Sequence, residues 1–180
     1  MKANHGLIIQ YAGISNPSGA VALNDRLFIV GDDEDNQLRI YDCNRFDKPI
    51  QTLSLSNLFK GVIKDGEDLE VDIESMATIN HVLFIIGSHS TSRTGEYRPA
   101  RHRLIALQFK LDANKKLTVN PIGEIYTQLI DSLKQDSRFN NYQFDKAEKL
   151  PPKAIGGLSI EGLASTPDNG LLIGFRNPLS

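Results

Sequence analysis

Carboxylates stand at the ends of three similar stretches of this sequence. Asp32 and Asp33 follow a glycine that ends the first stretch, whereas Glu74 and Glu161 begin the second and third. Carboxylate oxygens suit calcium, which takes about 6–8 oxygen ligands. We therefore predict that these four acids hold a calcium ion if the stretches meet in the fold. An EF-hand is excluded because Gln37 stands where that loop needs glycine. The alternative to metal binding is that residues 32–35 form a solvated turn.

Basic and polar side chains supply candidates for a second kind of chemistry. Arg101, Arg176 and Asn177 are the candidates for binding a phosphate or carboxylate group. His89 is the candidate general base, although a histidine that caps a turn is the simpler interpretation. Ser88 and His89 do not form a catalytic pair, because adjacent residues of an extended chain point to opposite sides.

Residues 65–74 are strongly acidic, and the acids in the second half of this stretch alternate. Alternation predicts that they share one face of a strand. The acids concerned are Asp68, Glu70, Asp72 and Glu74. Arginines of the loop 88–103 are the expected complement, and we favour structural pairing between arginine and carboxylate. In the alternative, the arginines hold a phosphate while the acids hold a metal ion.

The same arrangement of residues recurs in all three stretches. A small residue stands twelve positions before a glycine, in the pairs Gly19 and Gly31, Ser75 and Gly87, and Gly162 and Gly174. Between the two lie an apolar strand, a polar turn and a second apolar strand, which predicts a β-hairpin. The two strands of a hairpin run antiparallel, so the residue before the first lies beside the residue after the second. This predicts that Glu74 lies near Ser88 and His89, and Glu161 near Arg176.

Two more strands are predicted after each of the first two hairpins, at residues 37–42 and 49–55 and at residues 104–109 and 117–122. Repeats of about 40–50 residues with four strands each are typical of a β-propeller. We therefore predict a mainly β fold, a propeller-like stack of antiparallel four-stranded blades that forms a partial ring of about two and a half blades. The alternative is an open antiparallel sheet or a sandwich.

A helical insertion is expected near residues 124–136. Its apolar residues lie at helical spacing, at Tyr126, Leu129, Ile130 and Leu133. Residues 136–153 are polar and contain two adjacent prolines, which predicts an irregular connection.

Composition limits the classes of protein to consider. The 180 residues fit one domain, and a net charge of −2 argues against a general nucleic-acid binder. The start of the chain lacks the apolar segment of a signal peptide, and no apolar run approaches the ~20 residues that span a bilayer. One cysteine excludes an internal disulfide. We expect a cytoplasmic protein without membrane partners.

Six short motifs together carry a resemblance to a known family. They are residues 32–36, 72–74, 87–90, 101–104, 160–164 and 174–178. In combination they resemble a bacterial domain of unknown function that is propeller-like and distantly similar to esterase-like phytase propellers. The resemblance covers residues 19–179 apart from the helical insertion. Because members of that family are longer, it implies that residues 1–180 form one domain, the amino-terminal part of a longer propeller.

We predict a domain that binds a ligand or a partner, without demonstrable catalysis in this stretch of chain. The expected partners are a second copy of the chain or the rest of a longer propeller, and not nucleic acid. The alternative is a calcium-dependent, phytase-like phosphoesterase with its site at the mouth of the propeller channel. By analogy, the phytase resemblance implies phosphate-ester chemistry.

Overall fold

The computed structural model describes residues 8–45, 47–56, 63–64, 67–114 and 116–179. The first sheet has the strand order β1-β2-β3-β4 and follows the chain. Its strands are β1 (Pro17–Ala22), β2 (Leu27–Asp32), β3 (Gln37–Asp42) and β4 (Gln51–Ser54). All neighbouring strands are antiparallel, so this sheet is the predicted four-stranded blade.

The second sheet repeats this design with the order β7-β8-β9-β10. Its strands are β7 (Ile73–Ile79), β8 (Val82–Gly87), β9 (Leu104–Leu111) and β10 (Leu117–Pro121). The third unit is the hairpin of β11 (Ser159–Ser165) and β12 (Leu171–Asn177). The short strands β5 (Ile63–Lys64) and β6 (Glu67–Asp68) pair with each other, and they lie in the sequence between the first and the second sheet. The prediction of a mainly β fold with antiparallel four-stranded sheets is confirmed, and the arrangement of the sheets is consistent with a partial propeller-like stack.

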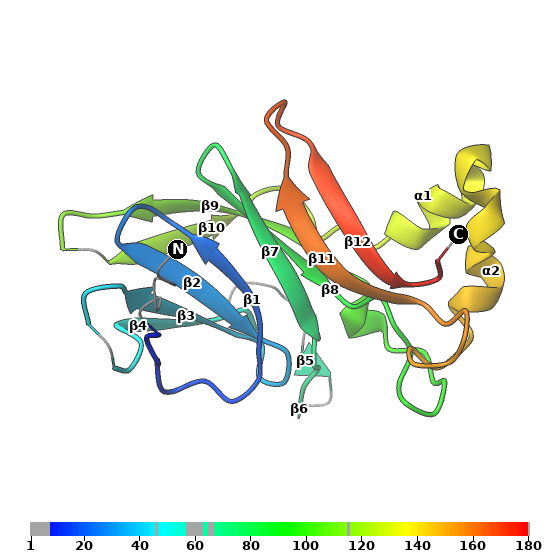
Figure 1. Ribbon diagram of the computed structural model, residues 1–180, viewed down its shortest axis with the longest axis horizontal. Helices are drawn as coiled ribbons and strands as arrows, with labels where there is room; N and C mark the ends of the chain where they lie inside the picture. The colour runs from blue at the N-terminus through cyan, green and yellow to red at the C-terminus, as the bar shows by residue number, and fades with distance from the viewer. Residues whose placement is uncertain (1–7, 46, 57–62, 65–66, 115, 180) are drawn as a thin grey trace, which may run out of the picture.

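The first strand of each unit lies at the centre of the stack. Strand β7 packs against both β1 and β11, and Figure 1 shows these three strands side by side. The turn of the second hairpin has positive φ at both Asn80 and His81, the conformation of a two-residue hairpin loop. In the first turn, Asn24 Oδ1 accepts hydrogen bonds from the backbone N–H groups of Arg26 and Leu27, each at 2.8 Å.

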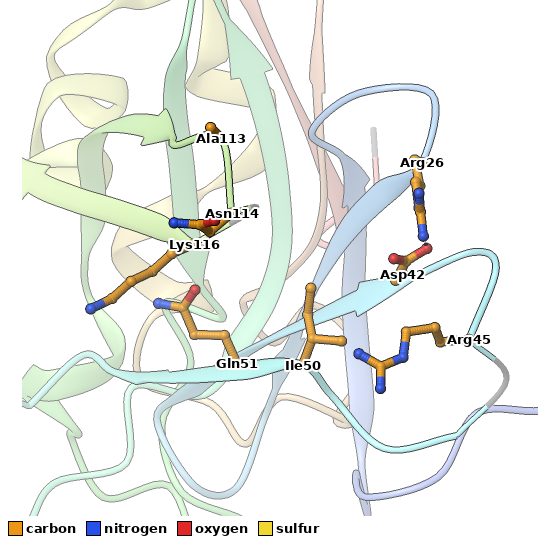
Figure 2. Close-up of a pocket in the computed structure, with 8 residues that line it drawn as sticks. All are labelled: Arg26, Asp42, Arg45, Ile50, Gln51, Ala113, Asn114 and Lys116. Carbon is orange, nitrogen blue, oxygen red and sulfur yellow. Dashed lines mark hydrogen bonds and ion pairs between the residues drawn. The ribbon is translucent and has the colours of Figure 1, made fainter.

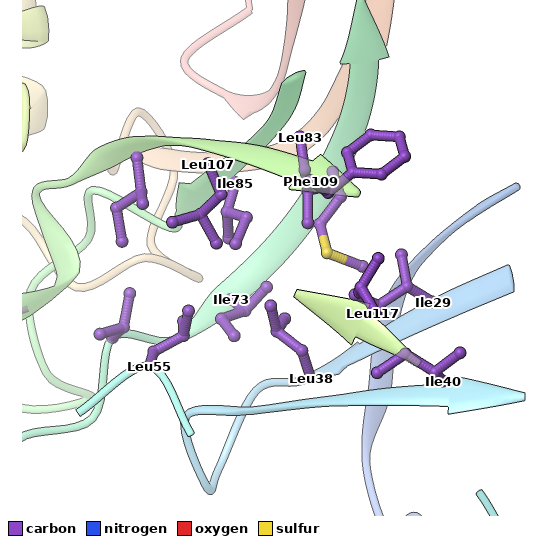
Figure 3. Close-up of a cluster of buried hydrophobic side chains, with 13 residues drawn as sticks. Ile29, Leu38, Ile40, Leu55, Ile73, Leu83, Ile85, Leu107, Phe109 and Leu117 are labelled. Atoms are coloured by element: carbon purple, nitrogen blue, oxygen red, sulfur yellow. The ribbon is translucent and has the colours of Figure 1, made fainter. Parts of the chain in front are cut away.

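Two clusters of buried apolar side chains hold the units together. The first lies between the two four-stranded sheets and includes Ile29, Ile40, Ile85 and Leu107 (Figure 3). Strands β2, β7 and β8 have no exposed position, because the stacked units cover both of their faces, whereas β1, β11 and β12 keep exposed residues. The second cluster joins the second sheet to the third hairpin and to the helices that follow β10.

A side-chain amide also connects the two four-stranded sheets. Gln51 lies at the start of β4, and Leu117 lies at the start of β10. The Gln51 amide nitrogen donates to the Leu117 carbonyl at 2.7 Å, and its oxygen accepts from the Leu117 N–H at 2.8 Å. These two bonds reproduce the pairing that a neighbouring strand would provide.

The insertion after β10 is more helical than predicted. The expected helix is present as α1 (Leu129–Gln135), but Tyr126 forms an extended bridge with Leu104 instead. The segment expected to be irregular contains the 3₁₀ helix η2 (Ser137–Tyr142) and the short α2 (Phe144–Ala147). That prediction was wrong because Phe144 and Ala147, although set among polar residues, are buried against the second cluster.

One more 3₁₀ turn, η1 (Pro99–Arg101), lies in the loop between β8 and β9. Among the described helices, none is long and apolar enough to cross a membrane.

Glycine allows the backbones of β1 and β7 to come very close. A Cβ atom on Gly19 would lie 2.9 Å from the Cα atom of Ser75, well inside van der Waals contact. The equivalent glycine of the third hairpin, Gly162, has room, since a Cβ there would lie 3.5 Å from its nearest neighbour, the Cα atom of Gly174. The small residue that opens each unit therefore has a steric role in the first copy that it lacks in the third.

We expect Gly19→Ala to lower the free energy of unfolding by about 1–3 kcal/mol, because β1 and β7 must separate to admit the methyl group. Gly162→Ala is the matched control and should change it by less than about 1 kcal/mol. Urea denaturation followed by circular dichroism measures both. Equal effects of the two substitutions would contradict the steric argument.

Candidate functional site

The three hairpins share one irregularity at the same end of the stack. The register of each pair shifts at one residue of the first strand, and the extra residues are Ser18, Glu74 and Glu161; the third pair also shifts at Arg176 of its second strand. Such β-bulges bend the strand and redirect a side chain, and they are frequent beside functional sites. The predicted meeting of hairpin ends is confirmed, since Ser88 N–H donates to the Asp72 carbonyl at 3.0 Å and Arg176 forms an ion pair with Glu161 at 2.7 Å.

Four acids gather at this end of the stack, and we call them the acidic junction: Asp33, Asp72, Glu74 and Glu161. Burial raises the pKa of Glu74 to about 8, assisted by the negative charges of Glu161, Asp72 and Asp33 and opposed by Arg176. Burial also raises the pKa of Asp33, with further contributions from the charges of neighbouring acids, Asp72 first among them. Glu74 therefore carries a proton at neutral pH, which relieves part of the repulsion.

The four acids predicted to hold calcium have different surroundings. Asp32 is fully buried and accepts hydrogen bonds from the backbone N–H groups of Ser15, Asn16 and Glu34, so it holds the turn together. The alternative of a solvated turn is therefore wrong for Asp32. Glu161 is engaged by Arg176 and by the Ser159 hydroxyl at 2.9 Å.

Asp33 and Glu74 remain without an ion pair or hydrogen bond to another side chain of the described residues, and Asp33 Oδ1 is buried without a partner. The residues as they stand do not fit a metal ion. Within the described ranges, no three His, Cys, Asp or Glu side chains form a group that could hold one.

The predicted phosphate ligands also have internal partners. Arg101 bridges Glu70 at 2.9 Å and Asp72 at 3.0 Å, and donates to the Ser90 hydroxyl at 3.2 Å. Asn177 donates to the Pro152 carbonyl at 3.3 Å. Arg101 thus confirms the favoured pairing between the acidic stretch and the arginine-rich loop.

The strand predicted across the acidic stretch is wrong. Asp72 has φ +58°, which interrupts an extended chain, and β7 begins only at Ile73. Both Glu70 and Asp72 nevertheless contact Arg101. The side chain of Asp68 lies outside the described part of the chain, as do Asp65 and Gly66.

The loop between β8 and β9 curls over this region and forms a cavity of about 740 Å³. The Ser92 hydroxyl accepts hydrogen bonds from the N–H groups of Thr94 and Glu96, and Gly95 takes a positive φ, so the loop folds back on itself. Three of its arginines line the cavity, which we call the arginine pocket: Arg93, Arg98 and Arg101. The remaining lining residues are Glu34, Leu69, Glu70, Ser92, Tyr97, Pro99 and Ala100.

The sequence places these arginines in one loop, but it does not indicate that they line one cavity, and Tyr97 was not among the predicted site residues. The signal that could have suggested the turn is Ser92 followed by Gly95, since a serine hydroxyl can bond backbone N–H groups just after it.

His89 is buried, not exposed at a channel mouth. Its Nδ1 lies 2.9 Å from the Gly87 carbonyl, so it caps a turn as the simpler interpretation held. Its ring lies 5.4 Å from that of His102, which in turn lies 4.7 Å from the Tyr97 ring. Burial lowers the pKa of both histidines to about 4, and the Nε2 atoms of both are buried without a hydrogen-bond partner in the described chain.

Comparison with known families gives one match. A sequence model of the family described as "Protein of unknown function (DUF3616)" matches residues 16–118. The matched range is more than half of the chain and contains β1 to β9, the acidic stretch and the arginine pocket. Glu161 and Arg176 lie beyond it. No curated protein matches the chain.

The two buried histidines predict a loss of stability in mild acid. Their pKa values are near 4 in the folded protein and near 6.5 in the unfolded chain, so the unfolded state binds protons first as the pH falls. The free energy of unfolding should therefore decrease between about pH 6.5 and 4, by up to about 1.4 kcal/mol per pH unit for each histidine.

His89→Asn should flatten this dependence, because asparagine tolerates the positive φ of this position and does not titrate. His81→Asn is the matched control, an exposed histidine that also has positive φ, and should leave the slope unchanged. Urea midpoints between pH 7.5 and 4.5 measure the slope. An unchanged slope in His89→Asn would refute this account of the histidine.

Proposed function

The chain belongs to the DUF3616 family of unknown function, and from the geometry of its loops we propose that it is a ligand-binding module that holds an anionic group in the arginine pocket. The observation that carries this proposal is the convergence of three arginines from one loop on one cavity. The volume of about 740 Å³ lies within the range of about 300–1,000 Å³ that is typical of small-molecule sites.

The three arginines differ in their availability. Arg101 is fixed by Glu70 and Asp72, so it has a defined orientation, but its charge is largely compensated. Arg93 is exposed and forms no ion pair with another described residue. Arg98 pairs with Glu96 at 2.9 Å, but that glutamate is 67% exposed, and such surface pairs contribute little, typically about 0–1 kcal/mol. Arg93 and Arg98 are therefore the arginines that a ligand would engage.

The rest of the lining narrows the class of ligand. Glu34 and Glu70 also line the cavity, so a ligand with several closely spaced negative charges would meet repulsion. The Tyr97 side chain is 65% exposed and offers an aromatic face, with Leu69 and Pro99 as further apolar surface. We infer a ligand with one anionic group, a phosphate or a carboxylate, attached to an apolar or aromatic portion.

Calorimetric titration with phenyl phosphate, benzoate and inorganic phosphate tests this proposal. We expect the phosphate or the carboxylate that carries a ring to bind more tightly than inorganic phosphate. Arg93→Ala and Arg98→Ala should each weaken binding about 10–100-fold, because each removes a charge-assisted hydrogen bond of about 1.5–3 kcal/mol.

Arg138→Ala is the matched control, since Arg138 is an exposed, ion-paired arginine outside the pocket. The proposal fails if none of the three ligands binds at millimolar concentration, or if all three arginine variants behave alike. Comparison of phenyl phosphate with benzoate separates phosphate from carboxylate recognition.

A calcium-dependent phosphoesterase is the second candidate, and it is the weaker one, because the described residues as they stand do not form a metal site. Asp72 favours it, because it contacts Arg101 of the arginine pocket while its charge acts on Glu74 of the acidic junction. Asp33 and Glu74 are the acids left to meet a cation, since Asp32 and Glu161 are engaged elsewhere.

Calcium titration and a nitrophenyl phosphate assay, with and without chelator, test this second candidate. Because Glu74 must lose a proton whose pKa is about 8, any calcium binding through Glu74 should be stronger at pH 9 than at pH 7, and weaker in Glu74→Gln. Absence of both heat and turnover would exclude the phosphoesterase and leave the binding module unaffected.

A further inference from the structure

The first strands of the three units present two different faces. Successive residues of a strand point to opposite sides, so the residue directly after the small opening residue lies on one face and the next residue lies on the other. The residues on the first of these faces are Ala20, Met76 and Leu163, and those on the second are Val21, Ala77 and Ala164.

Each contact inside the stack joins the second face of one unit to the first face of the next. Val21 of β1 packs against the apolar cluster between the two four-stranded sheets, in which Met76 of β7 is buried. Ala77 of β7 and Leu163 of β11 are buried together in the second cluster. The same kind of contact therefore occurs twice within one chain.

The second face of the third unit remains exposed, and we call it the β11 face: Gly162, Ala164, Leu172 and Gly174. Ala164 is exposed, and Leu172, its partner on β12, is 62% exposed. The three atoms nearest to a Cβ placed on Gly162 all belong to Gly174 of the same hairpin, whereas those nearest to one on Gly19 belong to the next unit. The β11 face thus lacks the neighbour that covers the corresponding face of β1.

The opposite end of the stack exposes the first face of the first unit, which we call the β1 face: Ala20 and Ala22. Figure 1 shows β1 and β11 on opposite sides of β7, which packs against both. The turn that follows β1 is fixed to β3 by the ion pair between Arg26 and Asp42 at 2.7 Å (Figure 2). The stack therefore ends in the two complementary halves of the contact that joins its units.

We propose that a second copy of the chain docks head-to-tail on the first, with its β1 face on the β11 face. The first unit of the second copy then continues the stack as β7 continues it after β1. Glycine and alanine on the two faces allow the backbones to come close, and the contact removes Leu172 from water. Because the two faces differ, the interface is heterologous, and further copies add until a ring closes or a longer assembly forms.

Sedimentation velocity, from a few micromolar to several hundred micromolar protein, tests this proposal. The mass should rise with concentration above the 20.0 kDa of one chain. Leu172→Glu and Ala20→Glu should each weaken association by about tenfold or more, because each places an unpaired carboxylate in the contact. Ile155→Glu is the matched control, an exposed apolar residue outside both faces, and should associate as the parent protein does.

A mixture of the two glutamate variants separates docking from misfolding. The Leu172→Glu variant keeps an intact β1 face, and the Ala20→Glu variant keeps an intact β11 face. An equimolar mixture should therefore form a complex of one copy of each, with twice the mass of one chain, although each variant alone is monomeric. This complex should not grow further, because both of its remaining faces carry a glutamate.

Three results would overturn the proposal. The first is the mass of a single chain at every concentration of the parent protein. The second is association of Ala20→Glu as strong as that of the parent, with loss only in Leu172→Glu, which would indicate that two β11 faces pair with each other. The third is a mixture of the two variants that stays monomeric.

Discussion

The close contact between the backbones of β1 and β7 determines most of what this structure can do. Only a residue without a side chain fits at Gly19, and the absence of a Cβ there lets the first two sheets stack with their inner strands nearly touching. This contact places the end of β2 beside the beginning of β7, and β11 follows on the other side. The acidic junction exists because three strand ends meet there, and the apolar clusters then fix their positions.

Such a meeting of carboxylates needs compensation, and the chain provides it in three ways. Arg101 neutralises Glu70 and Asp72, and Arg176 neutralises Glu161. Glu74 has no such partner and holds a proton instead. An isolated buried charge is unfavourable, so a group without a counterion takes up a proton. The acids of this region therefore form two groups. Glu70, Asp72 and Glu161 have arginine partners, whereas Asp33 and Glu74 have none among the described residues.

Periodicity and the recurring small residues were sufficient to predict the hairpins, the four-stranded sheets and the proximity of Glu161 to Arg176. These features follow from the geometry of antiparallel strands, which the spacing of residues determines. The positive φ of Asp72 and the burial of Asp32 were not predictable in this way. Both depend on partners distant in sequence or on backbone N–H groups. The arginine pocket depends likewise on a loop that the Ser92 hydroxyl bends back.

The amide of Gln51 has a consequence beyond joining two sheets. Strand β10 is at the outer edge of its sheet, and an outer edge presents N–H and C=O groups to which a strand of another molecule can pair. Gln51 occupies both groups of Leu117, the first residue of that edge. A foreign strand could not pair with β10 at this residue without displacing the amide. The Gln51 side chain thereby hinders edge-to-edge pairing with another molecule at the beginning of β10.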